Sequence, residues 1–274
     1  MLMAIDVGNT QIVVGLFTDD DDGGAGAGEL AHQWRVATHS MYTADEFALQ
    51  LSQLLALEGL CLSDVSGSVV SCVVPPLQMA LREMVGRRLS APSIVVEPGT
   101  RTGMPVLVDN PKEVGADRIA DAVAAYERWG GPTIVVDFGT ATNFEVVSAR
   151  GEYLGGVLFP GLEVSLNALT ARAAMLPRVD IAPPRSVMGK NTVEQLQAGI
   201  FYGYGAVVEG VCAKLKEVVG PATVVATGGL APVVVGSSPV IDHHEPWLTL
   251  YGLRTIYHRN RAGTERPDGK HASG

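Results

Sequence analysis

Two short turns in this chain combine an aspartate with glycine and small polar residues, a combination suited to phosphate chemistry. The first is DVGNTQIV at residues 6–13, and the second is DFGTATNF at residues 137–144. Glycine allows the backbone to approach a ligand closely, and the amides and hydroxyls can point at an oxyanion. A carboxylate beside phosphates is suited to holding a cation, often through water. Asp, Asn and Gly are common in ordinary turns, but the second copy favours two turns that grip a polyphosphate from both sides.

The segments that must position these turns share one pattern. Each aspartate follows an apolar run, and each turn precedes a β-rich segment. MLMAI and QIVVGLF flank the first turn, and PTIVV and NFEVVSA flank the second. Strand, turn and strand occur twice, about half a chain length apart, and predict an internally duplicated α/β protein with a mostly parallel sheet and local hairpins. Neither GxxxxGK(S/T) nor GxGxxG is present, which argues against a P-loop or Rossmann phosphate loop. We expect one domain at residues 1–116, a second at 117–262 and a disordered tail at 263–274.

Helical periodicity and capping residues predict the elements around the two turns. Residues 43–59 have a helical pattern with Thr43 as the N-cap. Residues 67–89 are expected to form a buried strand, a Pro-Pro turn and a helix. A further helix over residues 116–130 should end at Gly130.

The second half of the chain continues the same alternation. Residues 191–220 predict one or two helices, with Thr192 and Gln195 at capping-box spacing. A strand and a Gly-Gly turn follow at residues 222–234, whereas the glycine-rich residues 19–29 are expected to form a solvated hairpin loop.

Composition narrows the class of protein and of partner. With 20 basic and 29 acidic residues the net charge is −9, which argues against a nucleic-acid partner. No run of about 18 apolar residues could span a membrane, and MLMAI is too short for a signal peptide, so no membrane partner is expected. The three cysteines form no CxxC pair and sit among apolar neighbours, which predicts buried thiols in a reduced, soluble, cytoplasmic protein.

The paired motifs resemble the two phosphate motifs of the acetate and sugar kinase, Hsp70 and actin superfamily. More narrowly, four further segments resemble type III pantothenate kinase, and the likeness runs from about residue 2 to 260: NPKEVGADRIADAVAA, GKNTVEQLQAGIFYGY, ATGGLAP and LTLYGLRTIYHRN. This resemblance implies duplicated actin-like (ribonuclease H-like) domains, each a mixed sheet flanked by helices. It also implies ATP-dependent phosphorylation of pantothenate to 4'-phosphopantothenate, the first step of coenzyme A biosynthesis, by a homodimer.

The same resemblance implies the role of individual residues. Asp117 would be the general base that accepts the proton of the pantothenate hydroxyl as this oxygen attacks the γ-phosphorus of ATP. Asp6 would hold Mg²⁺ through water, and Asp137 would hold a monovalent cation, K⁺ or NH₄⁺. The substrate would be bound by Gly115, Ala116, Asp117, Arg118 and Thr192. ATP would be bound by Asp6, Val7, Gly8, Asn9, Thr10, Gln11, Ile12, Val13 and Thr140, with Gly228 and Gly229 close to adenine and ribose.

Structural roles compete with several of these assignments. Asp117 begins a helix and could cap its N-terminus. Asp121, one helical turn away, could raise the pKa of the base, but a charge on a solvated face is the simpler interpretation. Thr192 could be a helix N-cap, and one hydroxyl cannot easily serve both a cap and a ligand.

Other polar residues are less specific, and two positions depart from the family pattern. Lys190 could bind phosphate, although lysines beside turns are common, and His243 and His244 are expected in a surface turn rather than at a metal. Asn143 replaces a Thr found in many relatives, and Val108 occupies a place where many relatives have a substrate-facing Tyr.

Two other functions stay open at this stage. One is a kinase of the same superfamily that acts on another small alcohol, such as a sugar. The other is a catalytically inactive homologue that regulates gene expression. The presence of Asp6, Asp117 and Asp137 counts against an inactive protein, because such a protein has no physical reason to keep all three.

Overall fold

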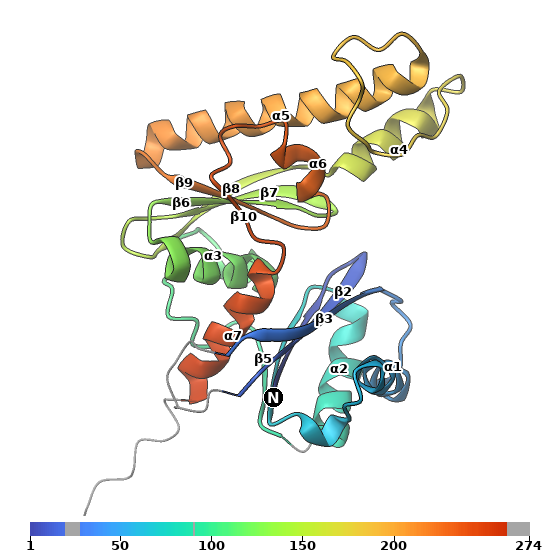
Figure 1. The fold of residues 1–274 in the computed structure, drawn as a ribbon. Coiled ribbons are helices and arrows are strands. Elements are labelled where there is room, and N and C mark those ends of the chain that lie inside the picture. The colour runs from blue at the N-terminus through green and yellow to red at the C-terminus, as the bar shows by residue number, and fades with distance from the viewer. Residues whose placement is uncertain (20–27, 90, 262–274) are drawn as a thin grey trace, which may run out of the picture. The chain divides into compact units, whose positions relative to one another are not determined.

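The computed structural model describes residues 1–19, 28–89 and 91–261, and their packing divides the chain into two compact units (Figure 1). The first unit contains Met1–Gly103, Val114–Val123 and the chain from Thr249 onward. The second contains Met104–Glu113 and Ala124–Leu248. The centre of the glycine-rich loop and the expected C-terminal tail lie outside the described residues.

Packing departs from the expected domain boundary at 116/117 in three segments, the first of which is Met104–Glu113 in the second unit. Helix α3 (Ala116–Trp129) begins in the first unit, and α7 (Leu248–Arg261) belongs to it almost entirely. The Tyr251 ring lies 5.7 Å from the ring of Phe17, and a side chain at Gly67 would collide with Tyr257. The apolar face of α7 is therefore buried against strands from the opposite end of the sequence, a partnership that local pattern does not reveal.

The first unit is built on a five-stranded mixed sheet with the order β3-β2-β1-β4-β5. β1 runs antiparallel to β2 and parallel to β4, so a hairpin and a parallel crossover meet at the same strand. The strands are β1 (Leu2–Val7), β2 (Gln11–Phe17), β3 (Leu30–Ala37), β4 (Gly67–Cys72) and β5 (Ser93–Val95).

The sheet of the second unit repeats the first. Read from the opposite edge, its order is β8-β7-β6-β9-β10, which matches that of the first sheet with β6 in the place of β1. β1 and β6 bury every residue except the fifth, which is Asp6 in one strand and Asp137 in the other. The pairing of the second and third strands is interrupted at the matching place in each unit. The strands are β6 (Thr133–Phe138), β7 (Ala141–Val147), β8 (Tyr153–Pro160), β9 (Thr223–Thr227) and β10 (His243–His244). The predicted duplication into two α/β domains with mixed sheets is confirmed. The prediction of a mostly parallel sheet is wrong, because each sheet has two parallel and two antiparallel pairings.

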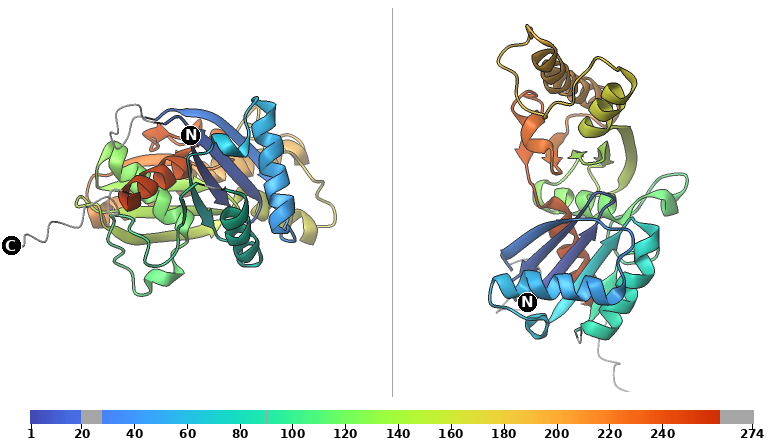
Figure 2. Two further views of the ribbon diagram at one scale, coloured as in Figure 1. Left: turned by 90° about the horizontal axis from the view of Figure 1, so that it is seen from below. Right: turned by 90° about the vertical axis from the view of Figure 1, so that its right-hand side faces the viewer.

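Helices cover both faces of the first sheet. α1 (Ala44–Leu57) and α2 (Pro75–Arg88) lie on one face and α7 on the other (Figures 1 and 2). Thr43 caps α1 as predicted, because its hydroxyl accepts the Glu46 N–H at 3.3 Å and its own N–H donates to the Glu46 carboxylate at 2.9 Å. The two prolines begin α2 instead of forming a separate turn, since the first helical positions need no N–H donor.

The second sheet is covered on one face by two helices. α5 (Thr192–Val219) is one continuous helix of 28 residues, and with α6 (Ala231–Val235) it packs on β6, β7 and β9 (Figure 1). The remaining elements are α4 (Leu162–Arg172) and the 3-10 turns η1 (Leu62–Asp64) and η2 (Pro111–Glu113). In the described part of the chain, no helix is long and apolar enough to cross a bilayer.

The cysteines only partly match the expectation of buried thiols. Cys212 is buried, and this burial raises the pKa of its thiol to about 11. Cys72 is half-buried. Cys61 is exposed, with its sulfur 3.0 Å from Oδ2 of Asp64, so the prediction of a buried thiol is wrong there. Its apolar neighbours Leu60 and Leu62 are only partly buried at the edge of the core.

Candidate functional site

The turn between β1 and β2 is held in shape by two hydrogen bonds to the backbone of Gly8. The Gly8 N–H donates to the Gln11 carbonyl at 3.0 Å, and the Thr38 hydroxyl donates to the Gly8 carbonyl at 2.7 Å. Asn9 and Thr10 are exposed at the tip of this hairpin. A rigid turn that presents an amide and a hydroxyl to solvent is suited to phosphate oxygens.

The hairpin residues face in two directions. The side chains of Val7 and Ile12 are buried in the core under α1 and α2, so only their backbone could contact a nucleotide. Asp6 points to the opposite face of the sheet and pairs in register with Ser71 of the parallel strand β4. Ser71 is fully buried, and its hydroxyl has no hydrogen-bond partner among the described residues. This serine was not singled out from sequence, because the β1–β4 register is a long-range property.

Asp117 is the second residue of α3 and lies near the carboxyl end of β4. Its Oδ1 accepts the Arg118 N–H at 2.8 Å, and a side chain at Gly115 would collide with this carboxylate and approach Val73 to 3.4 Å. Ile119 N–H donates to the Gly115 carbonyl at 3.2 Å, so Gly115 precedes the helix and Asp117 is not its N-cap.

The environment of Asp117 favours a carboxyl that can take up a proton. Burial raises its pKa above the ordinary value of 3.8, although the Arg118 N–H and guanidinium act in the opposite direction. Asp121, one turn further along α3, is only 3% exposed. The expectation of a charge on a solvated face is therefore wrong for Asp121, because this side of α3 is packed against the protein.

The turn between β6 and β7 resembles the first one but is one residue shorter. The Gly139 N–H donates to the Ala141 carbonyl at 3.0 Å, and Thr140 is exposed at the tip. Asp137 pairs in register with Asn143 of β7 on one side and with Thr227 of β9 on the other. These three polar side chains therefore share one face at the end of the second sheet.

The segment after β9 closes over Asp137. Gly228 has φ +92°, and a Cβ there would lie 2.6 Å from the Phe138 nitrogen and also collide with the Asp137 carboxylate. The Leu230 N–H donates to the Phe138 carbonyl at 3.2 Å. Oδ1 of Asn143 is buried and has no hydrogen-bond partner in the described residues. A carboxylate beside a buried, unpartnered amide oxygen fits a cation, since hard cations take oxygen ligands.

Thr192 is the first residue of α5, but it is not the cap. The Asn191 side chain accepts the Glu194 N–H at 2.9 Å and Glu194 accepts the Lys190 N–H at 3.1 Å, so the predicted Thr192–Gln195 capping box is wrong. The exposed Thr192 hydroxyl is thus available for a ligand, and the conflict between cap and ligand disappears. Lys190 is exposed.

The remaining candidates have simple structural positions. Gly229 is exposed after β9, and Val108 lies 3.6 Å from the Cβ position of Gly155. The adjacent histidines form the short strand β10 rather than a turn, and the His243 ring stacks on Trp129 with centroids 5.0 Å apart. No group of three or more His, Cys, Asp or Glu residues suited to a metal occurs in the portion of the chain described.

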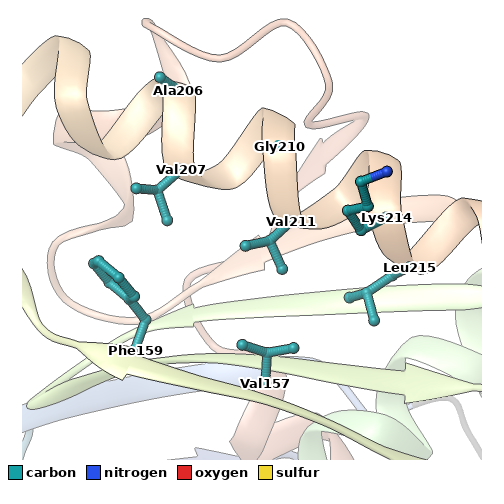
Figure 3. Close-up of a pocket in the computed structure, with 8 residues that line it drawn as sticks. All are labelled: Val157, Phe159, Ala206, Val207, Gly210, Val211, Lys214 and Leu215. Atoms are coloured by element: carbon teal, nitrogen blue, oxygen red, sulfur yellow. The ribbon is translucent and has the colours of Figure 1, made fainter.

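An apolar groove of about 440 Å³ lies between β8 and α5 (Figure 3). Val157 and Phe159 point from β8 toward Val207, Val211 and Leu215 of α5. Val157 pairs with Phe144, whose side chain is in the core under α5, whereas Asp137 and Asn143 face the other side of the sheet. The groove is therefore separate from the turn between β6 and β7.

Comparison with known proteins identifies the relatives of this chain. A family model for type III pantothenate kinase matches residues 2–214. Type III pantothenate kinase of Streptomyces griseus is 51% identical over 269 residues, which cover 95% of this chain and 98% of that protein. The enzyme of the same name from Acidothermus cellulolyticus is 52% identical over 262 residues, covering 95% and 99%.

Solved structures share the fold at low identity. A conserved putative Baf family transcriptional activator from Campylobacter jejuni aligns with a TM-score of 0.59 and 17% identity, over 95% of this chain and 99% of that one. At this identity the likeness concerns the fold alone. The sequence matches are much closer and nearly complete, and by them the chain belongs to the type III pantothenate kinase family.

Proposed function

We propose that this chain transfers the γ-phosphoryl group of ATP to the primary hydroxyl of pantothenate, forming 4'-phosphopantothenate in the first step of coenzyme A biosynthesis. The observation that carries the mechanism is Asp117, a partly buried carboxyl with a raised pKa near the carboxyl end of β4. Family membership supports the reaction, and this carboxyl supplies the base that the reaction needs.

Asp117 is proposed to act as the general base. The hydroxyl oxygen of pantothenate forms a bond to the γ-phosphorus, and its proton passes to the Asp117 carboxylate. The bond from the γ-phosphorus to the bridging oxygen breaks, and ADP leaves. Such transfers depend mainly on positioning and charge neutralisation. Helix α3 would position the base, and the hairpin would position the ATP phosphates.

The first hairpin is proposed to bind ATP. Asn9 and Thr10 would donate to phosphate oxygens, while Asp6 would hold Mg²⁺ through water. When bound, Mg²⁺ neutralises charge that develops on the phosphates. The buried, unpartnered hydroxyl of Ser71 beside Asp6 fits a hydrated cation at this place.

The second hairpin is proposed to hold a monovalent cation, K⁺ or NH₄⁺, and Thr140 to contact ATP. Asp137 would supply the charged ligand and Asn143 a neutral oxygen. The buried, unpartnered Oδ1 of Asn143 supports this assignment. The replacement of Thr by Asn at this position therefore keeps a ligand oxygen.

The substrate is proposed to bind where α3 begins. Gly115 and Ala116 would contact the substrate beside Asp117, and Arg118 would supply positive charge for the pantothenate carboxylate. The Thr192 hydroxyl, which is not needed as a helix cap, would donate to the substrate.

We also propose that the protein is a cytoplasmic homodimer joined through the second unit. Gly199, Gly203, Ala206 and Gly210 form an exposed stripe of small residues along α5 beside the apolar groove. Large apolar side chains are also exposed in this unit: Leu158, Val164, Leu169, Met175, Val187 and Met188. A surface this apolar is typical of protein–protein contacts. A cytoplasmic location is consistent with ATP as a substrate and with three free cysteines.

Release of ADP in the presence of Mg²⁺ tests the proposal. Turnover should require pantothenate, should not occur with a panel of sugars, and should increase when K⁺ replaces Na⁺. Asp117→Asn should lower kcat by roughly 10²–10⁴-fold while ATP still stabilises the protein. Nucleotide binding without turnover on any acceptor would instead favour an inactive regulator, and turnover on a sugar would favour the other kinase.

A further inference from the structure

Ser71 is a buried hydroxyl that the protein itself does not satisfy. It is the fifth residue of β4 and is 0% exposed, and its Oγ has no hydrogen-bond partner within the described ranges. A buried polar group without a partner is unfavourable, so such a group is usually satisfied by water or a ligand.

Another serine in the same strand shows that the fold can satisfy a buried hydroxyl at this depth. Ser68 is also 0% exposed, but its Oγ donates to the Ser93 Oγ at 2.6 Å. The two serines thus differ in partner and not in burial. This difference indicates that the hydrogen-bond partner of the Ser71 hydroxyl is a water molecule or a ligand rather than another group of the protein.

The position of Ser71 indicates what this partner is. Ser71 pairs with Asp6 in the parallel β1–β4 ladder, so both side chains lie on the face opposite the core under α1 and α2. Val73, two residues further along the same face, lies 3.4 Å from the Cβ position of Gly115. Ser71 is therefore located between the proposed magnesium-holding carboxylate and the segment that carries Asp117.

The second unit contains a similar strand pairing. Thr227 is the fifth residue of β9, pairs with Asp137 in the parallel β6–β9 ladder and is 2% exposed. A buried hydroxyl thus lies beside each of the two hairpin aspartates, and Ser71 and Thr227 occupy matching positions in the two sheets.

We propose that Ser71 is a positioning residue for the hydrated Mg²⁺ that accompanies ATP. A water molecule bound to Mg²⁺ is a hydrogen-bond donor, and the Ser71 Oγ beside Asp6 can accept a hydrogen bond from it. By accepting this hydrogen bond, Ser71 would orient one of the water molecules through which Asp6 holds Mg²⁺. This inference rests on the proposed function, since it assumes that the first hairpin binds Mg·ATP.

The test compares Ser71→Ala with Ser68→Ala in the full chain. Thermal unfolding is measured without ligand and then with ATP over a range of Mg²⁺ concentrations. Ser71→Ala should leave the Tm of the free protein unchanged or raise it, because no hydrogen bond is lost. It should raise the Mg²⁺ concentration at half-maximal stabilisation about tenfold. This is the lower end of the effect typical of residues that hydrogen-bond to the ligands of a metal. Ser68→Ala should lower the Tm of the free protein and leave the Mg²⁺ dependence unchanged.

A second pair of variants separates the hydroxyl from the shape of the side chain. Thr and Val have nearly the same volume, and the matching residue of the second unit is already Thr227. Ser71→Thr should keep the wild-type Mg²⁺ dependence, and Ser71→Val should show the tenfold shift. A wild-type Mg²⁺ dependence in Ser71→Ala or Ser71→Val would overturn the role of Ser71 while leaving the kinase intact. Absence of any Mg·ATP stabilisation or turnover in the wild type would instead overturn the proposed function, and the role of Ser71 with it.

Discussion

Gly228→Ala is the substitution whose effect can be worked out most fully from the structure. Gly228 follows β9 at φ +92°, where an L-residue is strained. The new methyl group would lie 2.6 Å from the nitrogen and 2.7 Å from the carbonyl carbon of Phe138, and it would also collide with the Asp137 carboxylate. Because two of these neighbours are backbone atoms of a buried strand, they cannot move aside as the end of a side chain could.

Two terms contribute to the expected loss of stability. A positive φ costs about 1–2 kcal/mol for a residue with a Cβ. Forcing a methyl group into a filled space costs about 1–3 kcal/mol more. The free energy of unfolding should therefore fall by about 2–5 kcal/mol, and displacement of Asp137 should abolish stabilisation by K⁺.

Gly59→Ala is the matched control for the first term. Gly59 follows α1 at φ +74°, and no atom lies within 4 Å of its Cβ position. This variant should lose only about 1–2 kcal/mol and keep the K⁺ response. Urea denaturation gives the two free energies, and thermal shifts in KCl and NaCl give the cation response. Equal losses in the two variants, or a normal K⁺ response in Gly228→Ala, would refute the reasoning.

Three further predictions concern Asp117, Asn143 and the groove. Because folding raises the pKa of Asp117, this group destabilises the native state progressively as pH rises from 3.8 through the raised pKa. Asp117→Asn should therefore increase the urea midpoint at pH 7, with a gain that disappears below pH 3.8; a gain that is independent of pH would contradict this. Asn143→Leu should keep or raise the Tm of the free protein and lose the K⁺-induced shift, whereas retention of the shift would exclude Asn143 as a ligand. Ala206→Glu should convert the proposed dimer to a monomer in light scattering, whereas Ala149→Glu, at an exposed turn of the same unit, should not.

Local signals in the sequence predicted most of the framework. The Thr43 cap with Glu46 was predictable because a capping box is read within four residues. The paired hairpins were predictable because strand, turn and strand are contiguous, and each copy supported the other. The duplicated fold follows from these two hairpins and the helices between them.

The wrong predictions concern residues whose environment is set by contacts with distant parts of the chain. Asp121 looks like a surface charge in a helical pattern, but it is buried by a packing that its neighbours in sequence do not show. Cys61 has apolar neighbours, yet it lies on an exposed turn before η1. Ser71 carries no local signal at all, since its meaning depends on its register with Asp6, about a quarter of the chain away. Roles such as that of Asp117 depended on family resemblance, because its residue type alone fits a helix start equally well.

The return of α7 to the first sheet has a consequence for the order in which the chain folds. During synthesis the strands of the first unit leave the ribosome first, but Phe17 and Gly67 stay uncovered on one face until Tyr251 and Tyr257 have been made. The second unit, by contrast, needs no residue beyond Leu248. Contacts between distant parts of a chain form slowly, because a long loop must be closed before they can form. The half that is translated first is therefore expected to be the half that is completed last, and a chain cut short before Thr249 should leave an exposed apolar face that promotes aggregation.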